Sequence, residues 1–400
     1  MKAFILSRLE AEGPVPFAQF MEWCLYHPQY GYYRSGQVRA GKGGDYYTAP
    51  CVHPLFGGMV ARQLSQMADG MGQGPFEVLE IGGGRGFLCL DILTWAREKI
   101  PEFFRRLRYL LLETNSHLIE EQRDRLSSFE KEGRVAWIDP ETFEKGVHRL
   151  TGCVLSNELI DAFPVHRVVM EGGRLKEIYV TQDRGELKEV LGEPSDPALL
   201  TYFDSLGIRL PEGYRTEVNL RALRWMENVG RFLDRGFVLT IDYGYLAEER
   251  YAPHRCHGTL LGYFRHRTSS NPYQHLGEQD LTSHVNFTDL IRKGEEVGLR
   301  FLGLVPQYRF LIALGILQEA DFLGQDLSNL EGLKMRLSLM HLIEPEAGMG
   351  ESYQVLIQGK GVGQPHLDGL RDLETIPWPD LSPDVPLRSP KPITPERGSP

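Results

Sequence analysis

A glycine-rich turn that follows an apolar run constrains the fold of this chain more than any other stretch. The run from Glu77 to Ile81 has the apolar character of a buried strand, and Gly82, Gly84 and Gly86 follow it at once. Glycine adopts positive φ angles easily and lets a ligand approach the backbone without meeting a Cβ atom. A helical pattern of apolar residues comes next, so free N–H groups and the helix dipole point at the turn. The stretch predicts a nucleotide-type site at the carboxyl end of a parallel strand.

The spacing of the glycines separates two cofactor classes. The dinucleotide fingerprint needs Gly or Ala where this chain has Phe87. The stretch from Glu80 to Gly86 instead reads E-x-G-x-G-x-G, and a further glycine, Gly83, stands at the second position of the turn, between the first two glycines of the pattern. It resembles the first motif of class I S-adenosylmethionine (SAM) methyltransferases. A plain strand-to-helix turn without a ligand is the alternative interpretation.

A second apolar run, from Arg108 to Leu112, ends at Glu113. In a doubly wound fold, the acid at the end of the second strand accepts hydrogen bonds from both ribose hydroxyls of the cofactor. We predict this role for Glu113; the alternative is a solvated carboxylate at a strand end. Asp139 and Asn157 end the next two predicted strands at the same edge of the sheet, and we expect them to contact the cofactor as well.

Composition and charge narrow the class of protein. The formal net charge of −10 argues against a general nucleic-acid binder, because such proteins carry a basic surface. The five cysteines form no C-x-x-C pair and the histidines show no metal-ligand spacing, which predicts neither disulfides nor a metal site and favours a reducing compartment. No apolar run reaches membrane-spanning length, and Glu10 and Glu12 make the N-terminus a poor signal peptide. We therefore expect a cytoplasmic protein without a membrane segment.

Strand-like and helix-like stretches alternate through the first half of the chain, which predicts an α/β fold around a parallel sheet. Residues 1–60 are expected to form a helical segment that either covers the cofactor as a lid or simply caps the fold. The methyltransferase-like domain is predicted at 61–362, with an antiparallel insertion at about 165–218 and a long loop without regular elements at about 245–285. The proline-rich segment 363–400 is predicted to be disordered.

The fourth predicted strand opens into Asn157-Glu158-Leu159-Ile160-Asp161, at the same edge of the sheet as the glycine turn. If this segment is a helical turn, its two carboxylates face the same way. They could then hold a planar guanidinium through its fork of N–H donors and offset its repulsion by the cofactor's sulfonium. The alternative, which the residues support equally well, is a helix start with Asn157 as N-cap and two acids favoured by the helix dipole.

The fifth predicted strand ends in Asp242-Tyr243-Gly244 and reaches the same edge of the sheet. We expect Asp242 and Tyr243 to form a wall of the substrate pocket. The alternative is an acid that caps the loop after the strand. No Ser/His/Asp arrangement for nucleophilic catalysis is recognisable in the sequence.

With these motifs together, the chain resembles the MidA-like methyltransferase family, which includes the mitochondrial complex I assembly-factor methyltransferase, a protein arginine methyltransferase. The resemblance covers nearly the whole chain to about position 361 and rests on these blocks: Phe17–Met21, Tyr26–Tyr33, Asp45–Pro50, Glu80–Gly86, Ser156–Val165, Ile241–Tyr245 and Gly277–Val285. It implies a seven-stranded class I sheet, with SAM over the glycine turn and Glu113 on its ribose. It also favours Glu158 and Asp161 as catalytic residues that hold an arginine guanidinium.

The function we expect is SAM-dependent methyl transfer to an arginine of a protein partner. The resemblance implies that this partner is a respiratory-complex subunit, and it places the eukaryotic members in mitochondria. Two other functions fit the same motifs. One is a non-catalytic SAM-binding assembly factor or scaffold, and the other is a small-molecule methyltransferase.

Overall fold

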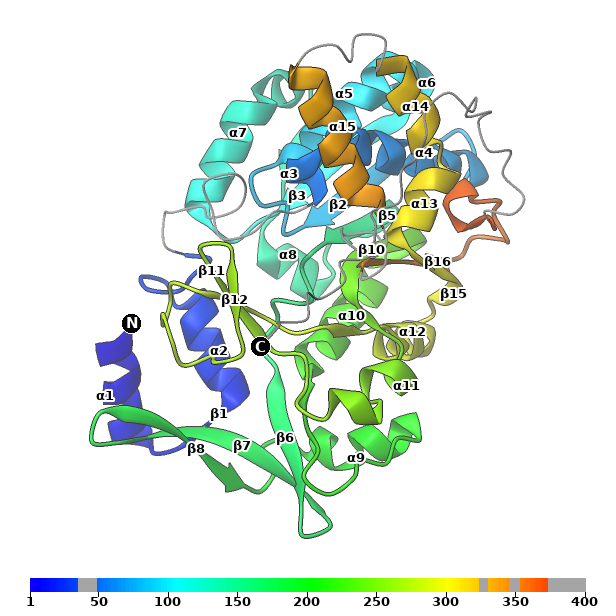
Figure 1. Cartoon of the computed structure of the whole chain (residues 1–400). Coiled ribbons are helices and arrows are strands. Elements are labelled where there is room, and N and C mark those ends of the chain that lie inside the picture. Colours follow the sequence, from blue (N-terminus) through cyan, green and yellow to red (C-terminus); the bar gives the residue numbers. More distant parts are fainter. Residues whose placement is uncertain (35–48, 324–329, 345–352, 373–400) are drawn as a thin grey trace, which may run out of the picture.

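The computed structural model describes residues 1–34, 49–323, 330–344 and 353–372. An α/β unit built around one sheet forms the upper part of the molecule in Figure 1, and smaller elements lie below it. Seven strands cross this sheet in the order β15-β16-β10-β5-β2-β3-β4, and the short strand β14 pairs with β10. The strands are β2 (Phe76–Ile81), β3 (Leu107–Leu112), β4 (Val135–Trp137), β5 (Leu150–Asn157), β10 (Leu233–Tyr245), β14 (Val285–Asn286), β15 (Arg300–Pro306) and β16 (Tyr353–Lys360).

The pairing of the strands confirms the predicted α/β class. β2 pairs in parallel with β3 and β5, β3 with β4, and β5 with β10, whereas β16 is antiparallel to both of its neighbours. The seven expected strands form the main path, and β14 makes an eighth strand in the sheet. From β2 the chain proceeds outward to β3 and β4 and then crosses back to β5. The order therefore reverses between β2 and β5, and ligands of such sheets bind outside the carboxyl ends of the strands at this point.

The strands of the sheet are apolar because both of its faces are buried. Neighbouring residues of a strand point to opposite faces. Leu111 and Leu239 accordingly belong to the hydrophobic cluster on one face, and Leu110 and Val238 to the cluster on the other. A strand buried on both sides reads as a continuous apolar run, which is why these strands are legible in the sequence.

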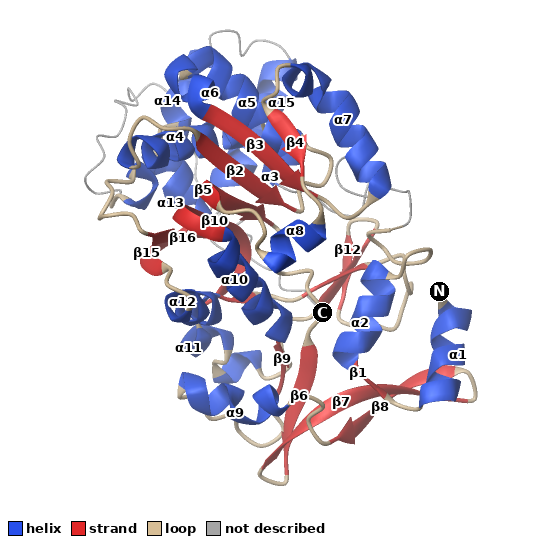
Figure 2. Ribbon diagram, turned by 180° about the vertical axis from the view of Figure 1, so that it is seen from behind, coloured by secondary structure: helices blue, strands red, loops and turns tan. Residues whose placement is uncertain are grey.

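Helices cover both faces of the sheet (Figure 2). α4, α5, α13 and α15 contribute to the cluster on one face, and α8, α10 and α12 to the cluster on the other. Each fully buried Leu or Phe stabilises the fold by about 1.5–3 kcal/mol. The helices of this unit are α4 (Leu55–Gly70), α5 (Phe87–Lys99), α6 (Pro101–Arg106), α7 (Ser116–Lys131), α8 (Pro140–Lys145), α10 (Leu220–Phe232), α12 (Phe287–Glu296), α13 (Gln307–Ala313), α14 (Ile316–Leu323) and α15 (Leu330–Ile343).

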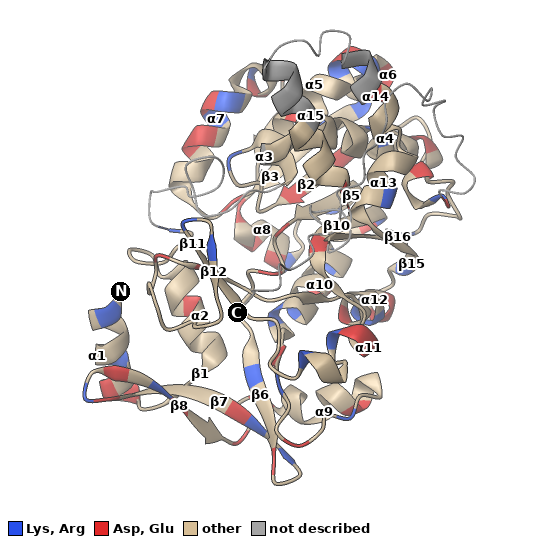
Figure 3. Ribbon diagram, viewed as in Figure 1, with Lys and Arg blue, Asp and Glu red and all other residues tan. Residues whose placement is uncertain are grey.

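α7 carries residues of both charge signs (Figure 3). One of them, Glu121, forms an ion pair of 2.8 Å with Arg85 of the glycine turn. Both side chains are about one-third exposed, so the pair adds at most about 1 kcal/mol to stability. A stronger restraint comes from Gln122, whose Nε2 donates to the carbonyl of Gly84 at 2.7 Å. α7 therefore fixes the outer side of the glycine turn.

A second, antiparallel sheet forms below the α/β unit. It runs in the order β1-β7-β6-β9, with β8 paired to β7, and the predicted hairpin of the insertion is its centre, because β6 pairs with β7. The N-terminal helices pack on it, and Ile5 and Phe20 share a buried cluster with Val165 and Val180. The elements are α1 (Lys2–Glu12), β1 (Val15–Pro16), α2 (Phe17–Tyr26), β6 (His166–Glu171), β7 (Arg174–Asp183), β8 (Glu186–Gly192), α9 (Pro197–Leu206) and β9 (Arg215–Val218). The short helix α3 (Ala49–Val52) belongs to the α/β unit instead, because Ala49 is part of its core (Figure 1).

The region at 245–285 differs from the expectation of a loop without regular elements. It contains α11 (Ala247–Arg250), a 3-10 turn, and the strands β11 (Leu261–Phe264), β12 (Arg267–Ser269) and β13 (Asp280–Thr282), which form a three-stranded sheet. Strands of three or four residues are too short for an alternating pattern to show in the sequence. Leu260 and Leu281 pack in the same cluster as the N-terminal helices, so this small sheet lies beside α2.

The proline-rich segment differs from the prediction in part. Residues 363–372 pack against α4, where Leu367 is buried and the N–H of Gly369 donates to Oε1 of Gln63 at 3.0 Å. The prediction of disorder is therefore wrong for these ten or so residues, and 373–400 lies outside the described part of the chain. Among the helices that the structure describes, none is both long and apolar enough to cross a membrane.

Candidate active site

The glycine turn lines a cavity of about 780 Å³ at the carboxyl edge of the central strands. Gly82, Gly84 and Gly86 have φ angles of 74°, 51° and 78°, in the left-handed region that favours glycine. A Cβ atom added to Gly84 would meet no atom within 4 Å, so a ligand can approach the backbone there. Gly82, Gly83 and Gly84 line the cavity, whereas Gly86 is the N-cap residue of α5 and is not part of the lining.

Glu113 follows β3 and lines the same cavity. Its Oε1 accepts hydrogen bonds from the backbone N–H groups of Thr114 and Asn115 at 2.7 and 2.9 Å, which fixes the carboxylate at the cavity wall. Burial raises the pKa of Glu113, and the backbone N–H donors and the Arg34 guanidinium oppose that shift. Its role as the acceptor of ribose hydroxyls stays a prediction that this geometry suits.

Asn157 and Asp139 lie in different surroundings. Asn157 lines the cavity, and its Oδ1 is buried without a hydrogen-bond partner among the described residues. An unpaired buried acceptor costs free energy, so a ligand that donates to it gains affinity. Asp139 instead is the N-cap of α8, because its Oδ1 and Oδ2 accept from the N–H and the hydroxyl of Thr142, both at 2.8 Å. It is absent from the cavity lining, so the structure replaces its predicted cofactor contact with a helix-capping role.

The two predicted catalytic acids lie on a turn that is not helical. β5 ends at Asn157 and no helix follows, so the expected helical turn and the alternative of an N-capped helix are both wrong. Glu158 has a φ angle of 50°, which is uncommon for a residue other than glycine. Glu158 and Asp161 nevertheless both line the cavity, and Leu159 between them packs against Gly82 of the glycine turn. The structure thus brings the acids and the glycine turn to one cavity.

Tyrosine hydroxyls hold both acids. Tyr353 donates to Oε2 of Glu158 at 3.3 Å, and Tyr243 donates to Oδ2 of Asp161 at 2.5 Å. Burial, with a smaller contribution from the charge of Asp161, raises the pKa of Glu158 from its ordinary 4.5 to about 8. Burial likewise raises the pKa of Asp161 from 3.8 to about 6, and the Tyr243 hydroxyl opposes this shift. A cation beside these carboxyls would lower both pKa values and be held strongly.

Of the two residues predicted as a pocket wall, one lines the cavity. Tyr243 does so, whereas Asp242 is fully buried behind the turn that carries Glu158 and Asp161. Its Oδ2 accepts hydrogen bonds from the N–H groups of Leu159 and Ile160 at 3.2 and 2.9 Å. The prediction that Asp242 forms a pocket wall is therefore wrong, because its carboxylate binds the backbone of the turn after β5.

Sequence reasoning missed several polar residues of the cavity: Tyr26, Tyr33, Glu80, Tyr263, Asp280 and Tyr353. The hydroxyl of Tyr33 donates to Oδ1 of Asp280 at 2.7 Å, so the N-terminal segment meets β13 at the cavity. Glu80 accepts a 2.8 Å hydrogen bond from Tyr109, and burial raises the pKa of Glu80 to about 7. The sequence carried a signal for two of these positions, because Tyr33 lies in the aromatic stretch after α2 and Glu80 begins the glycine motif. Tyr353, at the start of an antiparallel strand, had none.

Known proteins are similar to this chain in fold and in sequence. Residues 59–305 match the model of a family described as "Putative S-adenosyl-L-methionine-dependent methyltransferase". Because the match covers more than half of the chain, the protein belongs to this family. A crystal structure from Burkholderia thailandensis, bound to S-adenosyl-homocysteine and described as a "likely methyl transferase", is 31% identical with a TM-score of 0.82, and the match covers 92% of this chain and 93% of that one.

Curated relatives carry a more specific name. A Drosophila melanogaster protein named "Protein arginine methyltransferase NDUFAF7 homolog, mitochondrial" is 26% identical, over 90% of this chain and 85% of the relative. The Danio rerio protein arginine methyltransferase NDUFAF7, also named mitochondrial, is 26% identical over 88% of this chain and 84% of its own length. The Homo sapiens protein of the same name is 23% identical, over 79% and 73%.

The cofactor is SAM, as the family and the bound neighbour show, and the cavity residues fit it. The backbone at Gly84 is open to close approach, Glu113 is fixed at the wall as a hydrogen-bond acceptor, and Asn157 presents a buried oxygen that has no partner in the described part of the chain. In the described part of the chain, no group of three or more His, Cys, Asp or Glu residues could hold a metal ion.

Proposed function

We propose that this chain is a protein arginine N-methyltransferase, in which Glu158 and Asp161 hold the guanidinium of the acceptor. One observation carries the proposal: the buried carboxyl of Asp161 and the half-buried carboxyl of Glu158 line the same cavity as the glycine turn and Glu113. The names of the curated relatives support the same acceptor type.

The acidic wall suits a guanidinium better than a neutral acceptor. A guanidinium presents several N–H donors in one plane, and two carboxylates can accept them in pairs. The hydroxyls of Tyr353 and Tyr243 hold Glu158 and Asp161 in place, so little ordering is left to occur on binding. The cavity also contains the rings of Tyr33 and Tyr263, which can pack against the flat face of a cation.

SAM, when bound, supplies an electrophilic methyl group. The residues of the chain have three tasks: they orient the acceptor nitrogen, exclude water from it and receive the proton that it loses. Glu158 is the better candidate for the proton, because burial places its pKa at about 8, near the pH at which such a transfer is efficient. Asp161, with the lower pKa, stays ionised longer as pH falls and provides the charge that holds the cation.

The experiment is methyl transfer from labelled SAM to proteins in a lysate of a strain that lacks the gene, with mapping of the labelled residue by mass spectrometry. We expect label on an arginine of one or a few proteins when wild-type protein is added. Label on another residue type or on a small molecule would replace the acceptor we propose. SAM binding without any transfer would favour a non-catalytic assembly role.

A further inference from the structure

We propose that Asp242 is a positioning residue of the acceptor site, because its buried carboxylate holds the turn that carries Glu158 and Asp161. The inference rests on the proposed function of these two acids and adds a residue that does not itself reach the cavity. Asp242 is fully buried, and it lies on β10, the strand next to β5 in the sheet.

The geometry is that of an anion bound by consecutive backbone donors. Oδ2 of Asp242 accepts the N–H groups of Leu159 and Ile160, and its Oδ1 accepts the N–H of Tyr243 at 2.9 Å. Successive N–H groups converge on one oxygen when a left-handed residue bends the chain, and such concave backbone sites bind anions. Glu158, directly before these donors, has the required left-handed φ angle. The strain of that conformation persists only where the surroundings hold it, and Asp242 supplies this restraint.

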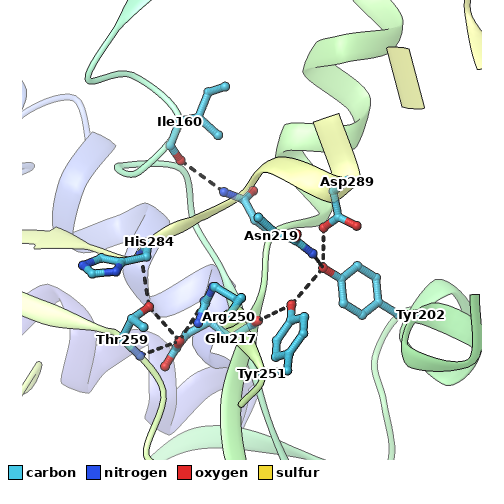
Figure 4. Close-up of polar contacts among 10 residues, drawn as sticks. Ile160, Tyr202, Glu217, Asn219, Arg250, Tyr251, Thr259, His284 and Asp289 are labelled. Atoms are coloured by element: carbon cyan, nitrogen blue, oxygen red, sulfur yellow. Dashed lines mark hydrogen bonds and ion pairs between the residues drawn. The ribbon is translucent and has the colours of Figure 1, made fainter. Parts of the chain in front are cut away.

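The carbonyl side of the same turn is held by different elements. Nδ2 of Asn219, at the start of α10, donates to the carbonyl of Ile160 at 3.1 Å, as Figure 4 shows. The N–H of Ser283 donates to the carbonyl of Asp161 at 2.9 Å. These contacts fix the far end of the turn. Asp242 holds the N–H groups of Leu159 and Ile160, which directly follow Glu158. Loss of the Asp242 carboxylate should therefore release the end of the turn that carries Glu158.

Asp242 also lies within electrostatic range of the two cavity acids. Its pKa is raised well above the ordinary value by burial and by the nearby Asp161 and Glu158 carboxyls. The groups that face Asp161 and Glu158 come from five further elements or segments: Tyr26 of α2, Asp242 and Tyr243 of β10, Tyr263 of β11, Tyr353 of β16 and the Ala49 N–H of α3. Asp242 is the acid among them, and because Asp161 and Glu158 raise its pKa rather than the reverse, its removal should leave the pKa values of these two acids nearly unchanged.

The test compares Asp242→Asn with Asp289→Asn as a matched control. Asp289 is a buried carboxyl on α12 that accepts a hydrogen bond from Tyr202 and lies outside the cavity lining (Figure 4). The amide of Asn at position 242 can offer one oxygen to the turn, but its NH2 then faces the N–H of Tyr243, so the arrangement cannot be kept. The probe is an acetylated Gly-Arg-Gly amide peptide, titrated by calorimetry in the presence of S-adenosylhomocysteine across pH 5.5–9.

We expect Asp242→Asn to weaken peptide binding at least about tenfold across this pH range, because the turn that carries the two acids is no longer held, and to leave the pH midpoint of binding within about half a unit of wild type. Affinity for S-adenosylhomocysteine should stay within about twofold of wild type, because the glycine turn and Glu113 are untouched. Asp289→Asn should lower the melting temperature and change neither peptide quantity. Equal peptide affinity in the two variants would overturn the inference.

A crystal structure of the Asp242→Asn variant is a second test, and it needs no acceptor peptide. We expect Glu158 to leave its left-handed conformation there, and an unchanged turn would overturn the inference. If the wild-type protein neither binds the peptide nor methylates arginine, the proposed function fails. The crystal structure still decides whether Asp242 positions the turn.

Discussion

The hydroxyl of Tyr243 donates a 2.5 Å hydrogen bond to Oδ2 of Asp161, while Oδ1 of the same carboxyl is buried without a hydrogen-bond partner among the described residues. The protein thus supplies a hydrogen-bond donor to one oxygen of this carboxyl, Oδ2. The second oxygen, Oδ1, is a buried acceptor, and leaving it without a donor costs free energy until a ligand supplies one. Since Asp161 lines the cavity, a guanidinium N–H is the donor that the proposed function supplies.

Replacement of Tyr243 by Phe tests this relationship. The hydrogen bond to a charged group is worth about 1.5–3 kcal/mol, so methyl transfer should fall about ten- to hundredfold. SAM affinity, measured by calorimetry, should change less than about twofold, because the phenol holds the acceptor side of the cavity. Tyr245→Phe, two positions along the same strand and outside the cavity lining, is the control. Equal rates in the two variants would show that the Tyr243 hydroxyl does not matter to transfer.

The cofactor side is tested by Glu113→Ala beside Asp139→Ala. Loss of the Glu113 carboxylate should weaken SAM binding at least about tenfold, because a charge-assisted hydrogen bond contributes about 1.5–3 kcal/mol. Asp139→Ala should instead cost about 1 kcal/mol of stability, the value of a helix N-cap, and leave SAM affinity unchanged. Calorimetry and thermal unfolding measure the two quantities. A folded Glu113→Ala protein with normal affinity would remove Glu113 from the cofactor site.

The buried acids predict that stability falls as pH rises from about 5 to 8. The folded-state pKa values of Glu158, Asp161 and Glu80 are about 8, 6 and 7, all above their ordinary values of 4.5, 3.8 and 4.5. In this pH window the unfolded chain binds fewer protons at these groups than the folded protein does, so deprotonation favours unfolding. Each such group adds a slope of up to about 1.4 kcal/mol per pH unit. Chemical unfolding at several pH values measures the slope, and Glu158→Gln should reduce it. An identical slope in that variant would contradict the raised pKa.

The sequence predicted those parts of the molecule in which local pattern and burial agree. The strands that end at Ile81, Leu112 and Asn157 are buried on both faces and stand out as apolar runs, and their carboxyl ends do meet at one cavity. The glycine spacing likewise indicated positive φ angles that the structure has at Gly82 and Gly84.

The errors arose where a long-range contact decides the local structure. The segment after Asn157 has the composition of a helix start, but the distant carboxylate of Asp242 binds its N–H groups and favours a turn. Asp139 was placed by its position at a strand end, although Asp-Pro-Glu is also the pattern of an N-cap followed by Pro in the first turn, which is how α8 begins. Tyr353 reaches Glu158 from 195 positions away in the chain, and no local pattern reports such a contact.

The central claim is that Glu158 and Asp161 hold an acceptor guanidinium, and the double variant Glu158→Gln, Asp161→Asn tests it most directly. Both changes keep the shape of the side chains and remove the negative charge. The measurement is the initial rate of methyl transfer from labelled SAM to lysate protein, with SAM affinity and melting temperature recorded on the same samples. The account predicts a fall of at least about a hundredfold in rate, the scale of losing a well-placed electrostatic group, with SAM affinity within about threefold of wild type. Near-normal transfer by a stable double variant would contradict it.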